Sequence, residues 1–187
     1  PGGMPFDPEP GTFGSGWRTG KPRPDFHLDA TPYAGDFDAY VKARFTPKSR
    51  KNMRNEWNVL ERRGAVAVEA ITDRSAMADL RADYEAWYRY GDADPEARRA
   101  KLETWWAVYE ALFDDLLAAS VMRVDGRPAS IVFGFRRGRD FDLFSLAFDP
   151  DLAELSVGKL HLQRVIRDFM TAGGDRFSFL VGDEDYK

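Results

Sequence analysis

Four consecutive residues near the C-terminal end of the chain form a turn that could hold a phosphate group. Ser156, Val157, Gly158 and Lys159 follow an apolar segment at 141–148 and open an amphipathic segment. A strand that leads into a helix through small residues gathers unpaired N–H groups at the positive end of the helix dipole. Because Gly158 lets the backbone approach closely and Lys159 could add a charge, we expect a pyrophosphate-sized site here. The alternative is an ordinary helix N-cap formed by Ser156.

The last six residues carry a second set of reactive side chains. Asp183, Glu184, Tyr186 and Lys187 follow an apolar segment at 176–181. A carboxylate can take up a proton, and a tyrosine hydroxyl or a lysine ammonium can give one up, so such a group can supply the base and the acid of a group transfer. The alternative is a solvated acidic loop with a structural tyrosine packed on the sheet.

A third cluster is cationic and lies in one predicted helix. Arg50 and Arg54 are four residues apart and share a face of that helix, where they could bind an anionic acceptor substrate. The same helix contains Lys51, Arg62 and Arg63. A solvated face with salt bridges is the alternative.

Other conspicuous residues are expected to be structural. Trp105 and Trp106 could stack on a sugar, but their helical spacing with Tyr109 is more typical of core packing. The two histidines, His27 and His161, are isolated in the sequence, and we assign neither a catalytic role.

The composition narrows the range of functions. Among 187 residues there is no cysteine, which excludes a disulfide frame, a thiol nucleophile and a thiolate metal site. Two histidines weigh against zinc chemistry, and we expect no metal. A formal net charge of −4 weighs against a nucleic-acid binder. No apolar run approaches the roughly 20 residues that span a bilayer, so the cytoplasm is the expected compartment.

Hydrophobic periodicity predicts the elements that must position these groups. We expect strands at 25–29, 65–71, 120–124, 129–136, 141–148 and 176–181, and helices at 36–44, 48–63 (closed by Gly64), 75–90 (capped by Ser75), 95–119 (with Leu102, Leu112, Phe113 and Leu116 on its buried side) and 157–172. The fold class is α/β (α+β), a mixed sheet with an antiparallel meander. The helix between the last two strands should be a crossover that makes them parallel.

This order of elements resembles that of the GNAT N-acyltransferases. Several local strings are similar to the CelD-like branch, the cellulose-biosynthesis acetyltransferases related to the Fem-type peptidyltransferases. The branch shows an Arg-x-x-Arg helix, a Ser-Pro-Gly turn and a Gly-Asp-Glu-x-Tyr-Lys ending in this order. The matching strings here are Lys-Ser-Arg-Lys-Asn-Met-Arg at 48–54, Leu-Glu-Arg-Arg-Gly at 60–64, Ala-Phe-Asp-Pro at 147–150, Ser-Val-Gly-Lys-Leu at 156–160 and Phe-Ser-Phe-Leu-Val-Gly-Asp-Glu-Asp-Tyr-Lys at 177–187.

The resemblance runs from about residue 26 to the end and includes two departures. Val157 stands where the family has proline, and the family continues past the Tyr-Lys pair with a helix and two more strands. The sheet, with splayed C-terminal strands, could therefore be truncated at both ends. We expect residues 1–24, rich in Pro and Gly, to be a tail or linker, 25–63 to be the remnant of or linker from an N-terminal lobe, and 64–187 to be the acyltransferase lobe.

The resemblance also implies an activity and a set of roles. The enzyme would move an acetyl or longer acyl group from acetyl-CoA or another acyl-CoA to an amine. The acceptor would be a small molecule or a glycan-linked amine, on a sugar or a cell-envelope or exopolysaccharide precursor. The following roles are implied: the turn from Ser156 to Leu160 holds the CoA pyrophosphate, Leu146 and Phe148 flank the pantetheine arm, Asp183 or Glu184 is the base, and Tyr186 and Lys187 are the acid or stabilise the oxyanion.

Two other functions stay open. A Fem-like transferase would draw on aminoacyl-tRNA, an option that the acidic net charge disfavours and the basic helix keeps open. A non-catalytic interaction module on a degenerate scaffold of this fold is the other. Association with a missing lobe or with a second copy of the chain is a further expectation.

Overall fold

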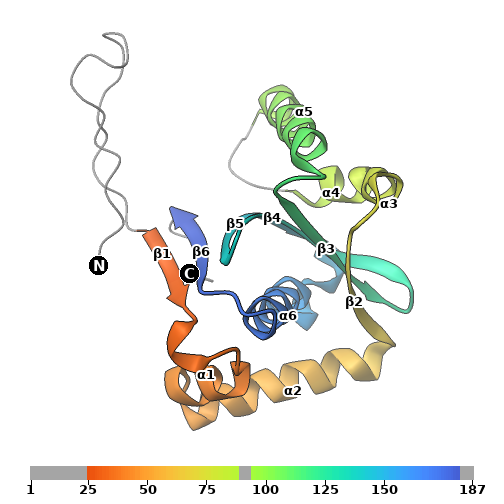
Figure 1. Ribbon diagram of the computed structural model, residues 1–187. Coiled ribbons are helices and arrows are strands. Elements are labelled where there is room, and N and C mark those ends of the chain that lie inside the picture. Colours follow the sequence, from red (N-terminus) through yellow and green to blue (C-terminus); the bar gives the residue numbers. More distant parts are fainter. Residues whose placement is uncertain (1–24, 89–93, 182–187) are drawn as a thin grey trace, which may run out of the picture.

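Six strands form a mixed sheet at the centre of the molecule (Figure 1). The structure is a computed structural model that describes residues 25–88 and 94–181. The strands are β1 (Asp25–Asp29), β2 (Val66–Ala70), β3 (Leu117–Val124), β4 (Arg127–Arg137), β5 (Asp140–Phe148) and β6 (Arg176–Val181). Their order across the sheet is β1-β6-β5-β4-β3-β2.

The topology confirms the predicted meander and crossover. β2, β3, β4 and β5 pair in an antiparallel series, whereas β5 and β6 are parallel. The helix α6 (Val157–Thr171) joins the two parallel strands. β3 turns into β4 through Asp125 and Gly126, which both have positive φ (49° and 77°), as the predicted tight hairpin requires.

Helices cover both faces of the sheet (Figure 1). On one face lie α6 and, outside it, α1 (Phe37–Arg44) and α2 (Pro47–Arg63). On the other face lie α3 (Arg74–Asp79), α4 (Arg81–Trp87) and α5 (Pro95–Leu112). Each face needs such cover because both faces of the central strands are apolar; along β4, positions 129–134 are all buried.

Aromatic rings dominate the core under α4 and α5. Tyr109 stacks on Phe133 of β4 with ring centroids 4.1 Å apart. Trp106 is 2% exposed, and Trp105 packs edge-on against Phe144 at 5.1 Å. Both tryptophans thus pack against the core, as expected.

Two predicted helices have different bounds in the structure. The helix expected at 75–90 begins one residue earlier and is broken at Leu80 into α3 and α4. Its N-cap is Asp73 rather than Ser75, and the Asp73 carboxylate accepts a hydrogen bond from the Ser75 N–H. The helix expected to reach residue 119 ends at Leu112, because the residues from 117 onward pair with β4. Leu116, expected on the buried side of that helix, is 37% exposed.

Gly64 lies at the C-cap of α2, as predicted, but not in the left-handed conformation typical of a glycine cap. Its φ is 167°, which is extended backbone. A Cβ at this position would overlap the Asp125 carboxylate, which accepts a hydrogen bond from the Ala65 N–H at 2.8 Å. The close approach of the Asp125 side chain, rather than the backbone conformation, therefore favours glycine here.

Residues 25–63 pack against the rest of the sheet. β1 is an edge strand antiparallel to β6, in which Leu28 pairs with Phe177. α2 contacts α6 through an ion pair between Glu56 and Lys159 at 2.8 Å. The predicted division of the chain at residue 63 stays a prediction.

Candidate functional site

The parallel strands β5 and β6 are paired over a short stretch and then diverge. Their register runs only from Asp140 opposite Arg176 to Asp142 opposite Ser178, although β5 continues to Phe148. The part of β5 beyond Asp142 therefore pairs with β4 alone, so the edge that faces β6 is left without ladder partners among the described strands. Free N–H and C=O groups on such an edge can pair with an extended ligand.

Both diverging strands are irregular next to this opening. In β5 the register with β4 shifts between Phe133 and Gly134, which leaves Phe144 without a partner. In β6, Leu180 has a φ of 57°, in the left-handed region, and its N–H donates to the Ser178 hydroxyl at 3.1 Å. Bulges and strained residues are over-represented beside functional sites because they redirect strands and side chains.

The N-terminus of α6 packs against the end of β5. A Cβ on Gly158 would lie 2.9 Å from Phe148 Cδ1 and 3.0 Å from Leu146 Cδ2, so a larger residue would push these side chains aside. Leu146 is half-buried, and Phe148 is 37% exposed. The structure thus brings together Gly158, Leu146 and Phe148, three of the residues predicted to bind the donor.

The first turn of α6 is not capped by a side chain. Ser156 has φ 55° and ψ 31°, and its hydroxyl makes no capping hydrogen bond, so ordinary N-capping by Ser156 is not what the structure shows. An uncapped first turn leaves N–H groups without intrahelical acceptors, at the positive end of a helix of 15 residues. This is a suitable cradle for an anion, next to the open edge of β5.

Other residues predicted for this turn have different surroundings. Val157 and Leu160 are fully buried, so their side chains cannot contact a ligand. The Leu160 N–H already donates to the Ser156 carbonyl at 3.0 Å, which leaves the N–H groups before it to bind an anion. The Lys159 ammonium lies 2.8 Å from both carboxylate oxygens of Glu56 on α2. Its charge is therefore already paired, so an anion at this turn would depend mainly on the N–H groups.

The residues predicted as base and acid lie outside the described part of the chain. Asp183, Glu184, Tyr186 and Lys187 follow β6, and their roles stay predictions. Among the described residues, no group of three or more His, Cys, Asp or Glu side chains could hold a metal ion.

One polar network that the sequence did not reveal lies between α6 and the sheet. His161 is fully buried; its Nδ1 is 3.0 Å from the Ser130 hydroxyl and its Nε2 is 3.0 Å from the Ser120 hydroxyl. Ser130 donates to the Ala147 carbonyl at 3.1 Å, so its hydroxyl accepts from the Nδ1–H of a neutral imidazole. Ser120 then donates to Nε2. Burial lowers the pKa of His161 from 6.5 to about 3, which keeps the ring neutral.

A second buried network lies on the opposite face of β5. The hydroxyls of Tyr84, Tyr109 and Ser145 form a triangle with edges of 2.9 to 3.1 Å. Burial raises the pKa of both tyrosines, so both stay protonated at neutral pH. The sequence features that could have predicted this network are a serine inside an apolar strand and two tyrosines at buried helical positions. The triangle ties α4 and α5 to β5 beside the bulge at Phe144.

The two predicted acceptor-binding arginines lie together but away from the diverging strands. Arg50 and Arg54 line a groove between α1, α2 and α6 with a volume of about 610 Å³. None of its lining residues belongs to the sheet, and α6 lies between the groove and β5. A small acceptor held by these arginines would not reach the open edge of β5.

Comparisons with known proteins bear on the family and the fold of the chain. The model of the acetyltransferase (GNAT) domain family matches residues 47–187. The C-terminal domain of an assigned lysylphosphatidylglycerol synthetase of Agrobacterium fabrum superposes with a TM-score of 0.55 at 13% identity, over 84% of this chain and 46% of that one. A conserved protein of unknown function from Bacteroides thetaiotaomicron gives a TM-score of 0.54 at 13% identity, over 88% of this chain and 53% of that one.

These likenesses establish the fold alone, which is the predicted mixed α/β architecture. The chain spans about half the length of the two solved structures. No curated protein matches the sequence significantly. In the part of the chain that the structure describes, no helix is both long and apolar enough to cross a membrane.

Proposed function

This chain belongs to the acetyltransferase (GNAT) domain family, and on that premise we propose that it transfers an acetyl or longer acyl group from acyl-CoA to an amine. The observation that carries the proposal is the uncapped N-terminus of α6, held by Gly158 against the end of β5 where that strand has left β6. A phosphate cradle and an open strand edge lie side by side there. Acyl-CoA carries a pyrophosphate and an amide-containing arm, and these two features fit the two parts of the site.

The donor supplies an activated thioester, and the protein binds and orients it. The N–H groups of the first turn of α6 would hold the pyrophosphate. The free edge of β5 would pair with the amides of the arm, and Leu146 and Phe148 would contact its apolar part. These contacts fix the direction in which the thioester enters the space between β5 and β6.

Acyl transfer then requires proton movement at two atoms. The acceptor nitrogen loses a proton as it attacks the thioester carbonyl, and the departing sulfur gains one. We assign the first step to Asp183 or Glu184, and the second to Tyr186 or Lys187, because these residues directly follow β6. The buried hydroxyls of Tyr84 and Tyr109 hold β5 in place and need not react.

We propose that the acceptor is a sugar-linked amine of a cell-envelope or exopolysaccharide precursor, as in the CelD-like branch. A second candidate is transfer from aminoacyl-tRNA, as in the Fem-type enzymes. The observation that favours it is the basic character of residues 37–63, which hold eight Lys and Arg against three Asp and Glu. Binding of tRNA that weakens steeply with salt would distinguish the second candidate from the first.

Titration with acetyl-CoA tests the donor site. A ligand at one hundred times its Kd raises the free energy of unfolding by about 2.7 kcal/mol, which a melting curve detects readily. We expect Gly158→Glu to weaken binding at least about tenfold, or about 1.4 kcal/mol, relative to Gly158→Ala. Both substitutions push against Phe148, but only Glu places a negative charge at the cradle. Equal acetyl-CoA affinities of the Glu and Ala variants would contradict the proposal.

A further inference from the structure

The groove between α1, α2 and α6 has the features of a second ligand site. Its rim carries five cationic side chains and two carboxylates. The cations are Lys42, Arg50, Arg54, Arg164 and Arg167, and the carboxylates are Asp38 and Glu61. The protein as a whole carries a net charge of −4, so this concentration of positive charge is local. A volume of about 610 Å³ lies within the range of small-molecule sites, about 300–1,000 Å³.

Two of the five cations are free to bind a ligand. Arg167 pairs with Asp38 at 3.1 Å, and Arg164 pairs with Asp168 at 3.0 Å. In contrast, the side chains of Lys42 and Arg54 make no hydrogen bond or ion pair with another residue in the described ranges 25–88 and 94–181.

Arg50 is held in position beside them. Its Nη1 donates to the Phe45 carbonyl at 2.8 Å and to the Lys42 carbonyl at 3.2 Å, at the end of α1. A guanidinium has five N–H donors, so the remaining ones can still bind an oxyanion. Because its position is already fixed, Arg50 loses less side-chain freedom when a ligand binds.

The floor of the groove is apolar and partly aromatic. Phe37, Val41, Met53 and Trp57 line it beneath the cationic rim. The indole N–H of Trp57 donates to the Gln163 side-chain oxygen at 3.2 Å, which fixes the ring between α2 and α6. A ligand that fits has anionic oxygens at one end and a flat or apolar group at the other.

We propose that this groove binds the phosphate groups and base of a nucleotide, either free or as the nucleotide part of a nucleotide-linked sugar. Arg54, Lys42 and Arg50 contact the phosphate oxygens, and the base lies on the Trp57 side of the floor. The site is separate from the acyl-CoA cradle. Its walls come from the outer side of α6 and from α1 and α2, whereas the cradle is the first turn of α6 at the sheet.

The experiment uses the Gly158→Glu protein, so that nucleotide binding at the donor cradle does not contribute. ADP, UDP and a UDP-linked sugar are titrated into it, with calorimetry and tryptophan fluorescence as readouts. We expect saturable binding, a fluorescence change that is lost in Trp57→Phe, and a loss of affinity of at least about tenfold in Arg54→Ala. Arg54 is exposed and has no partner among the described residues, so this variant should melt at the parent temperature.

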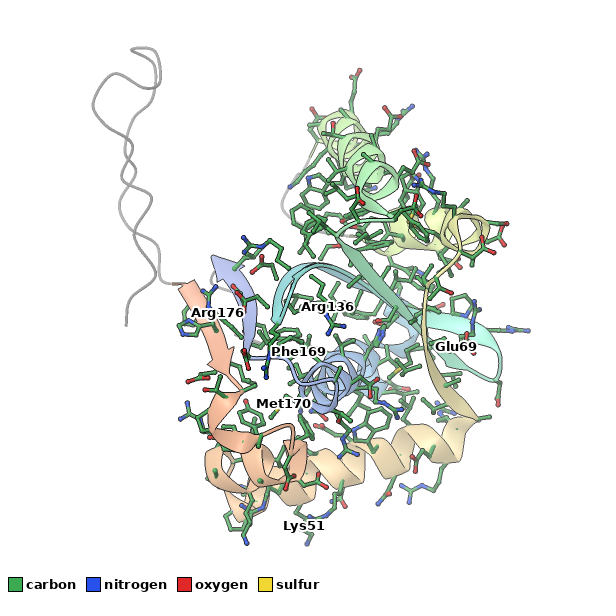
Figure 2. All side chains as sticks on the ribbon, in the orientation of Figure 1. Lys51, Glu69, Arg136, Phe169, Met170 and Arg176 are labelled. Carbon is green, nitrogen blue, oxygen red and sulfur yellow. The ribbon has the colours of Figure 1, made fainter. Side chains whose placement is uncertain are left out.

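Lys51→Ala is the matched control. It removes one positive charge from the same helix, but Lys51 is not part of the groove and points away from α6 in Figure 2. We expect it to change nucleotide affinity less than about twofold. Tighter binding of the UDP-linked sugar than of UDP would identify the sugar-linked form as the ligand, and equal affinities would identify the free nucleotide.

Two results would overturn the proposal. One is the absence of binding of all three probes at millimolar concentration. The other is an equal loss of affinity in Arg54→Ala and Lys51→Ala, which would indicate diffuse attraction of a polyanion to the whole of α2. In either case acetyl-CoA binding by the unmodified chain would still support the proposed function, because the groove contributes no residue to the donor cradle.

Discussion

The two sides of α6 differ in the burial and pairing of their polar side chains. On the inner side, His161 is fully buried between Ser120 and Ser130, and burial keeps its ring neutral. On the outer side, Arg164 and Arg167 pair with carboxylates and line the groove. One helix thus combines an uncharged, fully bonded anchor with a charged, partly open surface.

The inner side of α6 fixes the position of the helix, whereas the outer side is the one that can bind a ligand. The His161 network connects α6 to β3 and β4, and through Ala147 to the end of β5, next to the residues that contact Gly158. The position of the anion cradle relative to β5 therefore depends on the inner side. Arg164 and Arg167 on the outer side take no part in that network.

The largest expected effect comes from replacing the anchor. His161→Leu leaves the Ser120 hydroxyl without its buried acceptor, and the leucine side chain does not match the shape of the imidazole ring. We therefore expect a loss of about 2–4 kcal/mol in the free energy of unfolding. Arg164→Leu on the outer side removes only an exposed pair and should cost about 0.5 kcal/mol or less. Urea denaturation measures both. Similar losses in the two variants would show that the two sides of α6 do not differ as described.

A pH dependence sharpens the same contrast. In the unfolded chain His161 titrates near 6.5, whereas in the folded protein its pKa is about 3. Between these values the unfolded state binds more protons, so stability is fully present above pH 6.5 and falls as the pH is lowered. We expect the loss to approach about 1.4 kcal/mol per pH unit between pH 6 and pH 5, above the range where most carboxylates titrate. His161→Gln should remove this slope from the urea midpoints, and a slope that persists in the variant would have to arise elsewhere.

The smallest effect is expected at the exposed link between α2 and the first turn of α6. Lys159→Ala breaks the ion pair with Glu56, which is partly exposed, and should cost about 0–1 kcal/mol, less at high salt. Because Glu56 already holds the ammonium, we expect acetyl-CoA affinity to fall less than about threefold. A loss as large as that of Gly158→Glu would show that Lys159 leaves Glu56 to bind the donor.

Much of the fold could be read from local pattern. The strand predicted at 141–148 differs from β5 by one residue, and the Asp-Gly pair at 125–126 predicted the hairpin, in which both residues have positive φ. The break at Leu80 was missed because the apolar periodicity of the segment continues through it. The end of α5 was missed because residues 117–119 suit a helix as well as a strand, and only pairing with β4 decides between them.

The sequence by itself determined the order of the elements, the parallel pairing of the last two strands and the glycine-containing first turn of α6, because these follow from local residue patterns and from the order of the elements along the chain. Only the tertiary structure decided the surroundings of those residues. Ser120 and Ser130 meet His161 from 41 and 31 residues away, and Glu56 meets Lys159 from 103 residues away. Hydrogen bonds and ion pairs of this kind depend on which faces of distant elements come into contact. The neutrality of His161, the pairing of Lys159 and the separation of Arg54 from the donor cradle all follow from those contacts.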